Sequence, residues 1–323
     1  VTLTCDNRCV FCPRSTLRHV SVRDAGDLDA RLEAIRAHST RVILTGGEVA
    51  RLPDAAELIA HCRDLGFVDI ALISNGRAFA DPARARALVD AGLTEVSVSL
   101  YDLRAEVHDG LTRTPGSHAE TTAGLAQLLA LSRDRDDLAV RVNTLLCEAN
   151  ADGLPDLLRD LAPRGVRGVL VADVVLSDAM DAPVPHDRVA QLARAAAADP
   201  ALRGLDVTWR GFPLCVLHDI PGVVAEPQNV DTTVVDEGSL DPYFAEFFRH
   251  FVHADACGAC PERDRCPGLQ RRYRDRLGDA HLRAIAAAEV PGDVGDLAGF
   301  APERDPGRLA VTPTTACQLR CRY

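Results

Sequence analysis

Short apolar runs alternate with longer amphipathic segments through the first half of the chain. The runs have the length of strands and are apolar on both faces, as buried strands are. We predict strands at residues 1–3, 41–45, 69–74, 95–100, 138–146 and 166–174. Apolar positions at helical spacing predict intervening helices at residues 28–38, 54–66, 81–92, 119–132 and 154–165.

This alternation predicts an α/β fold with parallel strands, because each helix carries the chain back to the start of the next strand. The pattern fits either a barrel or a doubly wound sheet. Both architectures bind ligands at the carboxyl ends of their strands. The residues that follow each predicted strand are therefore the candidates for function.

Composition narrows the possible functions. The chain has 323 residues, 47% of them hydrophobic, so it can form one large domain and a smaller one. Its net charge is -11 with 4% aromatic residues, which argues against a nucleic-acid partner. All 36 basic residues are Arg, which excludes a lysine Schiff base. No apolar run approaches the roughly 20 residues that span a bilayer, so we expect no membrane partner.

The 11 cysteines occur in clusters rather than spread through a small, loop-rich chain. Clustering favours metal sites over a disulfide framework and predicts a reducing, cytoplasmic setting. The first cluster, "CDNRCVFC", contains Cys5, Cys9 and Cys12. Three thiolates leave either a four-iron cubane or a tetrahedral zinc one ligand short. A zinc site completed by a remote residue remains the alternative.

Polar residues follow the predicted strands where a ligand would bind. "TGGE" ends at Glu48 after the second strand, and "ISNG" ends the third. A Gly-Gly-Glu sequence alone indicates only a turn, but its glycines allow close backbone approach and its carboxylate can accept charge-assisted hydrogen bonds. "SVSLYD" ends the fourth strand, and "RVN" lies on the fifth.

Taken together, the C-x-x-x-C-x-x-C loop and these strand-end motifs resemble the radical S-adenosylmethionine (radical SAM) superfamily over about residues 1–181. The resemblance implies a partial (β/α)6 TIM-like barrel. It also implies a [4Fe-4S] cluster held by Cys5, Cys9 and Cys12, whose open iron binds the amino and carboxylate groups of SAM. One-electron reduction then cleaves SAM to a 5'-deoxyadenosyl radical, which abstracts hydrogen from a substrate.

The resemblance also implies which residues contact SAM. Phe11 lies near the adenine, and Gly46, Gly47 and Glu48 bind the ammonium group. Ser74 and Asn75 face SAM, Ser99 bonds the ribose hydroxyls, and Arg141 and Asn143 lie at the SAM carboxylate and neighbouring polar atoms. His108 and Arg113, in the segment after the fourth strand, are interpreted as loop-ordering residues.

A second cysteine group follows the barrel. Cys215, Cys257, Cys260 and Cys266 make a complete ligand set for one metal centre. The segment resembles the SPASM and Twitch extensions of radical SAM enzymes, which implies an auxiliary [4Fe-4S] cluster; structural zinc is the alternative. The next SPASM cysteine would fall at Gln270, so the pattern supports one auxiliary cluster. Cys62 and Cys147 are left over and are predicted to be small buried hydrophobes.

The predicted organisation has four parts: a barrel at residues 1–182, a cysteine-rich extension at 183–289, a linker at 290–308 and a second domain beginning at 309–323. The linker is rich in Gly, Pro and Asp. The last part repeats C-x-x-x-C at Cys317 and Cys321. We therefore expect the sequence to be a piece of a tandem radical SAM protein.

The expected function is radical SAM catalysis on a ribosomal peptide, with an electron donor such as flavodoxin or ferredoxin. A small-molecule or cofactor-forming enzyme is the alternative within this class. A noncatalytic iron-sulfur or zinc scaffold is the alternative from another class. The intact cysteines and Glu48 argue against the scaffold, because a degenerate site would have lost some of them.

Overall fold

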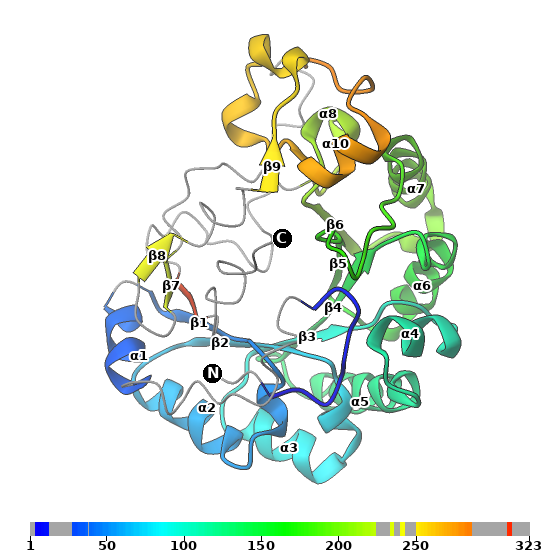
Figure 1. The fold of residues 1–323 in the computed structure, drawn as a ribbon. Helices are drawn as coiled ribbons and strands as arrows, with labels where there is room; N and C mark the ends of the chain where they lie inside the picture. Colours follow the sequence, from blue (N-terminus) through cyan, green and yellow to red (C-terminus); the bar gives the residue numbers. More distant parts are fainter. Residues whose placement is uncertain are drawn as a thin grey trace.

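The computed structural model describes residues 4–12, 28–37, 39–223, 233–235, 240–242, 250–285 and 309–311. Its centre is a curved, seven-stranded parallel sheet with helices on its outer face (Figure 1). The strand order is β11-β1-β2-β3-β4-β5-β6. The strands are β1 (Arg41–Leu44), β2 (Asp69–Ser74), β3 (Glu95–Ser99), β4 (Ala139–Leu146), β5 (Gly168–Asp173), β6 (Asp206–Arg210) and β11 (Leu309–Val311).

The helices follow the strands as crossover connections. They are α1 (Leu28–Arg36), α2 (Ala55–Asp64), α3 (Pro82–Asp90), α4 (Ala105–Thr112), α5 (Ser117–Ser132), α6 (Leu154–Leu161) and α7 (His186–Ala198). Five predicted strands and five predicted helices are confirmed to within a few residues. The predicted strand at residues 1–3 lies outside the described residues. The predicted partial (β/α)6 barrel is confirmed by β1 to β6 and their helices.

The barrel sheet extends beyond residue 182, where we expected it to end. Helix α7 leads into β6, which pairs in parallel with β5 through Val169 opposite Val207. The expected boundary between barrel and extension therefore moves to Arg210. The sequence did not indicate β6 because its side chains alternate between polar and apolar, so it has no apolar run.

Strand register places polar and apolar side chains on opposite faces of the sheet. Val42, Leu72, Val96 and Val142 are buried on the face that the helices cover. The opposite face carries Glu95, Ser97, Ser99, Arg141 and Asn143 on β3 and β4. Because side chains alternate along a strand, β3 and β4 present polar groups to the barrel interior and apolar groups to the helix-facing core.

A chain of ion pairs crosses this polar face where the strands begin. Arg41 contacts Asp69 at 2.8 Å and Glu95 at 3.1 Å. Arg141 contacts Glu95 at 3.3 Å and Asp206 at 3.5 Å. Four of the five partners are the first residues of their strands, so the network closes the amino-terminal end of the barrel.

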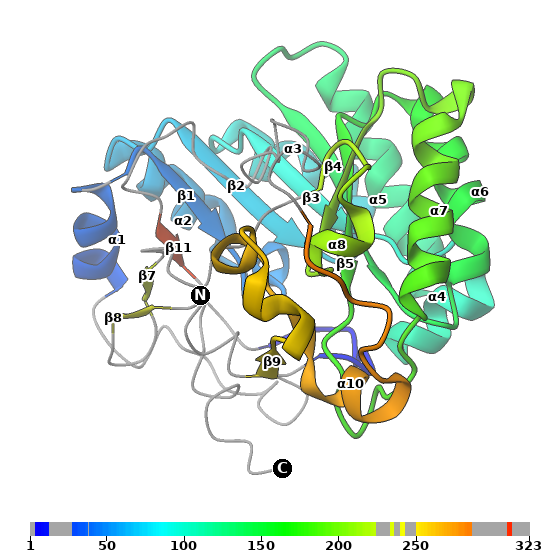
Figure 2. The same cartoon turned by 90° about the horizontal axis from the view of Figure 1, so that it is seen from above.

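The extension is a small lobe beside the β5–β6 end of the sheet (Figures 1 and 2). It contains α8 (Leu214–Leu217), the antiparallel pair β9 (Phe251–Val252) and β10 (Leu269–Gln270), and α10 (Arg271–Leu277). The 3-10 turns η8 (Asp255–Ala259) and η9 (Arg263–Arg265) lie between these strands. Strands β7 (Thr233–Val235) and β8 (Leu240–Pro242) form a separate antiparallel pair.

Gln270 and Tyr273 of this lobe both contact the barrel. The Gln270 amide donates to the Asp173 carboxyl and to the Val174 carbonyl, both at 2.8 Å. The His186 ring at the start of α7 stacks on Tyr273 of α10, with ring centres 4.0 Å apart. Gln270, where a further SPASM cysteine was expected, therefore joins the lobes through hydrogen bonds.

Strand β11 occupies the free edge of β1. Leu309 lies opposite Val42 and Val311 opposite Leu44 in parallel register. The expected second domain begins with this strand, while Cys317 and Cys321 lie outside the described residues. Whether residues 309–323 open a second domain stays a prediction.

The two remaining cysteines lie in the core. Cys62 and Cys147 are 0% and 1% exposed and pack within the main hydrophobic cluster, as predicted. None of the helices in the described ranges is both long and apolar enough to cross a membrane.

Candidate functional site

The first cysteine loop, residues 4–12, lies across the carboxyl ends of the central strands. The Glu48 N–H donates to the Thr4 carbonyl at 2.8 Å, which holds the start of the loop beside β1. The N–H groups of Arg8 and Val10 donate to the carbonyls of Thr112 and Leu111, at 2.8 and 2.9 Å. The loop is therefore fixed between the end of β1 and the last turn of α4.

Cys5, Cys9 and Cys12 are free thiols on this loop and are partly exposed. Burial, the Glu48 carboxylate and the neighbouring Asp6 and Cys12 raise the pKa of the Cys5 thiol to about 12. The Cys5 thiol thus lies beside two acidic side chains, Glu48 and Asp6. Nowhere in the described part of the chain do three His, Cys, Asp or Glu side chains come close enough to hold a single metal ion.

Glu48 follows the turn that begins at Gly46, whose φ of 136° is a conformation that favours glycine. The Glu48 carboxylate is 2% exposed and accepts hydrogen bonds from the Ser74 hydroxyl and the Asn75 N–H, both at 2.7 Å. Burial raises its pKa to about 7 against the effect of these donors. Among the described residues no Arg or His pairs with this carboxylate. A buried acid without a cation fits the ammonium group of SAM.

Ser74 and Asn75, which we expect to face SAM, make hydrogen bonds within the site. The Ser74 hydroxyl donates to Glu48 and accepts from the Gly76 N–H at 2.9 Å. The Asn75 amide donates to the Asp6 carboxylate at 2.6 Å. Both residues hold other parts of the site: Ser74 orients Glu48, and Asn75 secures the cysteine loop.

Arg77 also holds this loop, although no sequence pattern pointed to it. Its guanidinium donates to the Asp6 carbonyl and to the Asn7 side chain, both at 2.9 Å, and to Glu120 at 2.7 Å. A single Arg after a strand resembles any solvated loop residue. Its position directly after "ISNG" was the only available signal.

Ser99 and Asn143 lie opposite each other on the polar face of the sheet. The Ser99 hydroxyl hydrogen-bonds to the Tyr101 side chain. The Asn143 side-chain oxygen is buried and has no hydrogen-bond partner among the described residues. An unpaired buried acceptor normally marks a missing partner, so Asn143 fits a role in ligand binding.

The Arg141 guanidinium is not directed toward Ser99 and Asn143. It contacts Glu95 and Asp206 at the amino-terminal end of the barrel. The expected place of Arg141 at the SAM carboxylate stays a prediction that these ion pairs do not support. Its two ion pairs leave it as part of the network that closes the barrel.

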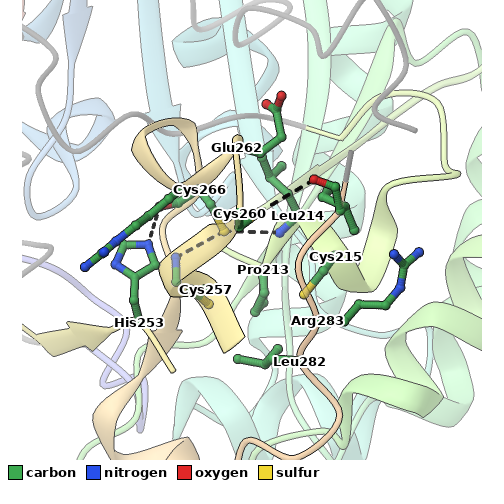
Figure 3. A pocket seen from close by; sticks show the side chains of 13 residues that line it. Pro213, Leu214, Cys215, His253, Cys257, Cys260, Glu262, Cys266, Leu282 and Arg283 are labelled. Atoms are coloured by element: carbon green, nitrogen blue, oxygen red, sulfur yellow. Dashed lines mark hydrogen bonds between the residues drawn. The ribbon is translucent and has the colours of Figure 1, made fainter. Parts of the chain in front are cut away.

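The second cysteine site is a pocket in the extension. Cys215, Cys257, Cys260 and Cys266 all line it, as Figure 3 shows. The N–H groups of Leu214 and Gly268 donate to the Cys266 sulfur, each at 3.4 Å. Burial raises the pKa of the Cys266 thiol to about 12.

These features fit a cluster held by four thiolates. The four thiols line one cavity. N–H groups directed at a ligand sulfur are also a usual means of adjusting the potential of an iron-sulfur cluster.

Comparison with known proteins places this geometry in a family. A sequence model of the radical SAM superfamily matches residues 1–161. The GTP 3',8-cyclase of Marinobacter nauticus is 24% identical over 249 residues, which cover 76% of this chain and 66% of that protein. The PqqA peptide cyclase of Methylocella silvestris is 31% identical over 143 residues, 44% of this chain and 35% of that protein. The chain thus spans less than two thirds of the length of these relatives.

A solved structure shares the fold. Streptococcus suis SuiB bound to S-adenosylmethionine matches with a TM-score of 0.58 and 12% identity, over 88% of this chain and 75% of that one. Members of the matched superfamily use a [4Fe-4S] cluster and SAM. With the cysteine loop, the buried Glu48 and the parallel barrel in place, the chain belongs to the radical SAM superfamily.

Proposed function

We propose that this protein reductively cleaves SAM and uses the resulting radical to remove hydrogen from a substrate. The observation that carries the proposal is Glu48, a buried carboxylate beside the three-cysteine loop with no cation among the described residues. When bound, the cluster and SAM supply a one-electron cleavage that yields a 5'-deoxyadenosyl radical. An electron donor such as flavodoxin or ferredoxin supplies the electron.

The side chains bind and orient the reactants. Cys5, Cys9 and Cys12 hold three irons and leave the fourth to SAM. Glu48 accepts a hydrogen bond from the ammonium group of SAM. The glycines before Glu48 let the protein backbone approach SAM closely. Asn143 and Ser99 offer polar atoms on the inner face of the sheet, while the apolar ring of Phe11 borders the adenine.

The four cysteines of the extension support an auxiliary cluster with no open iron. Four thiolates complete the ligand set of a cubane, so a substrate atom has no iron to bind. This favours electron transfer over substrate anchoring. A cluster held by these four cysteines would supply an acceptor for the electron of the substrate radical.

A ribosomally made peptide is the substrate class we propose. The matched PqqA peptide cyclase carries a peptide in its name, and SuiB has been solved with its precursor peptide SuiA, a structure that matches this fold with a TM-score of 0.50. A nucleotide substrate is the second candidate, because the GTP 3',8-cyclase aligns over 76% of this chain.

Anaerobic reconstitution tests the proposal. Protein loaded with iron and sulfide should convert SAM to 5'-deoxyadenosine in the presence of dithionite, and Cys9→Ala should abolish this. Cys62→Ala removes a buried cysteine far from the loop and should keep the activity. No 5'-deoxyadenosine from a well-loaded protein would leave the noncatalytic scaffold as the better explanation.

The substrate class requires a second assay. The loaded enzyme is incubated with SAM and either a candidate precursor peptide or GTP, and the products are followed by mass spectrometry. A peptide lighter by two hydrogens supports the proposed class. A cyclised nucleotide with unchanged peptide would replace it by the second candidate.

A further inference from the structure

A column of aromatic rings backs the first cysteine loop. The Phe11 ring, adjacent to Cys12, meets the Tyr101 ring edge-on, with centres 5.0 Å apart and an angle of 74°. Tyr101 in turn stacks on His108, with centres 5.4 Å apart and an angle of 26°. The loop residue that borders the third cysteine therefore rests on side chains from the segment that follows β3.

His108 forms the buried base of this column. It is 0% exposed, and its Nδ1 accepts a hydrogen bond from the Tyr101 N–H at 3.2 Å. Burial lowers the pKa of the ring to about 4, so His108 is neutral near pH 7 and its hydrogen is on Nε2. The acceptor nitrogen is therefore committed to Tyr101.

The Tyr101 backbone is held on both sides. Its N–H donates to His108, and its carbonyl accepts from the Asn150 amide at 2.8 Å. Burial, and then the coulombic effect of the Cys9 thiolate, raise the pKa of its hydroxyl well above its usual value. A shift of the Tyr101 backbone would therefore move the ring that contacts Phe11.

The same helical turn that carries His108 also binds the loop directly. The carbonyls of Leu111 and Thr112, three and four residues after His108, accept the N–H groups of Val10 and Arg8. Carbonyls in the last turn of a helix have no partner within that helix and are available for such contacts. Helix α4 thus holds the cysteine loop through its backbone and through the His108 side chain at once.

We propose that His108 is a positioning residue for the cysteine loop, acting through the hydrogen bond from the Tyr101 N–H to its Nδ1. It fixes Tyr101, which supports the Phe11 ring beside Cys12, and so sets the position of the cysteine loop and of the adenine side of the SAM site. Only the cluster-binding role of the loop is taken from the proposed function. The positioning itself concerns the polypeptide alone.

Three substitutions of His108 distinguish the role of its Nδ1 acceptor from the role of its stacked ring. His108→Asn retains an acceptor oxygen near the position of Nδ1 but loses the stacked ring. His108→Phe keeps a ring but leaves the Tyr101 N–H buried without a partner. His108→Ala removes both.

The first readout is amide hydrogen exchange of residues 4–12 in reduced protein free of iron. We expect the Arg8 and Val10 amides to exchange at least about tenfold faster in His108→Ala and His108→Phe, the size of one lost hydrogen bond. His108→Asn should stay close to wild type. Equal protection in all variants, or protection restored by Phe and not by Asn, would overturn the proposal.

The second readout is the response of the reconstituted cluster to SAM. Binding of SAM changes the electron paramagnetic resonance spectrum of the cluster with an open iron. We expect His108→Ala and His108→Phe to need at least about tenfold more SAM for this change, and His108→Asn to need little more than wild type. An unchanged SAM requirement in His108→Ala would count against the proposal.

His186→Asn is the matched control. His186 is 4% exposed and stacks on Tyr273, but it belongs to the contact between barrel and extension. We expect its replacement to lower thermal stability without changing exchange in residues 4–12. If His186→Asn raised amide exchange in residues 4–12 as much as His108→Ala does, the effect would reflect a general loss of stability and would overturn the proposal. If wild-type protein did not cleave SAM, the proposed function would fail, while the exchange experiment would still decide the role of His108.

Discussion

The Asn75 amide donates a hydrogen bond to the Asp6 carboxylate across 2.6 Å, which joins the residue after β2 to the residue after Cys5. The same carboxylate lies 3.3 Å from the Arg77 guanidinium. The cysteine loop is thus fastened to the sheet by charge and hydrogen bonding in addition to the packing of Phe11 on Tyr101. Its geometry should depend on these few groups.

Asn75→Asp should weaken the first cluster site. The new carboxylate would face Asp6 and add a like charge where a donor stood, which is destabilising at this separation. We expect iron bound at the first site to fall at least several-fold, together with 5'-deoxyadenosine formation. Iron and sulfide analysis after reconstitution measures the loss.

Asp81→Asn is a useful control for that experiment, because Asp81 caps α3 through the Ala83 N–H at 2.9 Å, away from the loop. Its change should leave iron content unaltered. Full iron loading in Asn75→Asp would show that Arg77 and Arg51 hold Asp6 without Asn75.

Glu48→Gln should reduce SAM affinity. The amide keeps one acceptor oxygen but loses the charge and presents N–H groups to the Asn75 N–H or the Ser74 hydroxyl, which are donors to Glu48 now. A charge-assisted hydrogen bond is worth roughly 1.5–3 kcal/mol, so the SAM dissociation constant should rise about 10- to 100-fold. Anaerobic equilibrium binding measures it.

Glu57→Gln removes one charge from the exposed surface of α2 and should leave SAM binding as it is. If Glu48→Gln bound SAM as tightly as wild type, the ammonium group would have to bind elsewhere.

Cys215→Ala should distinguish the roles of the two cysteine sites. Loss of one of four thiolates should remove about four irons per chain from reconstituted protein while the first cluster stays. SAM cleavage should continue, and substrate conversion should stop because the substrate radical has no electron acceptor. Metal analysis and product assays on the same sample test both statements. A loss of zinc instead of iron would support a structural zinc site.

Sequence patterns predicted the buried strands because strands covered on both faces carry long apolar runs, as in "DIALIS" of β2. Strand β6 was not predicted, because Asp206, Thr208 and Arg210 alternate with Val207 and Trp209 and no continuous apolar run appears. Helix α4 was not predicted, because it is short and contains Gly110. Periodicity thus reports burial on both faces more readily than burial on one.

For a related reason, the positions of some site residues could be predicted from the sequence and those of others could not. Residues attached directly to a strand end, such as Glu48, take their position from the backbone, and the motif alone predicts it. The position of the Arg141 guanidinium depends on Glu95 and Asp206, which lie 46 and 65 residues away in sequence and carry no local signal. The attachment of Arg77 to Asp6 is equally non-local, so neither pairing could be predicted from spacing.

The contact between Asp173 and Gln270 should make stability depend on pH. Burial raises the pKa of the Asp173 carboxyl to about 7, above its usual value of 3.8. The folded protein therefore holds a proton that the unfolded chain releases between about pH 4 and pH 7. This contribution to stability is complete below pH 4 and is lost as the pH rises through 7.

Asp173→Asn should remove this dependence, because the amide resembles the neutral acid and can still accept from Gln270. Between pH 5 and pH 8 wild-type protein should lose roughly 1–2 kcal/mol more stability than the variant, a figure reduced for the partial exposure of Asp173. Denaturant unfolding at several pH values measures the difference. His186, whose pKa is lowered to about 3 by burial, has the opposite pH dependence but is present in both proteins, so the comparison cancels it.

Asp178→Asn provides the matched control, since Asp178 pairs with Arg272 at the same contact between the lobes but is exposed. It should retain the wild-type pH dependence. If Asp173→Asn also retained it, the Asp173 carboxyl would be ionised in the folded protein at pH 5, and Gln270 would be held by a charged partner. The amide of Gln270 would then bind the barrel through a charge-assisted hydrogen bond, and its loss in Gln270→Ala should cost more stability at pH 8 than the loss of a neutral bond.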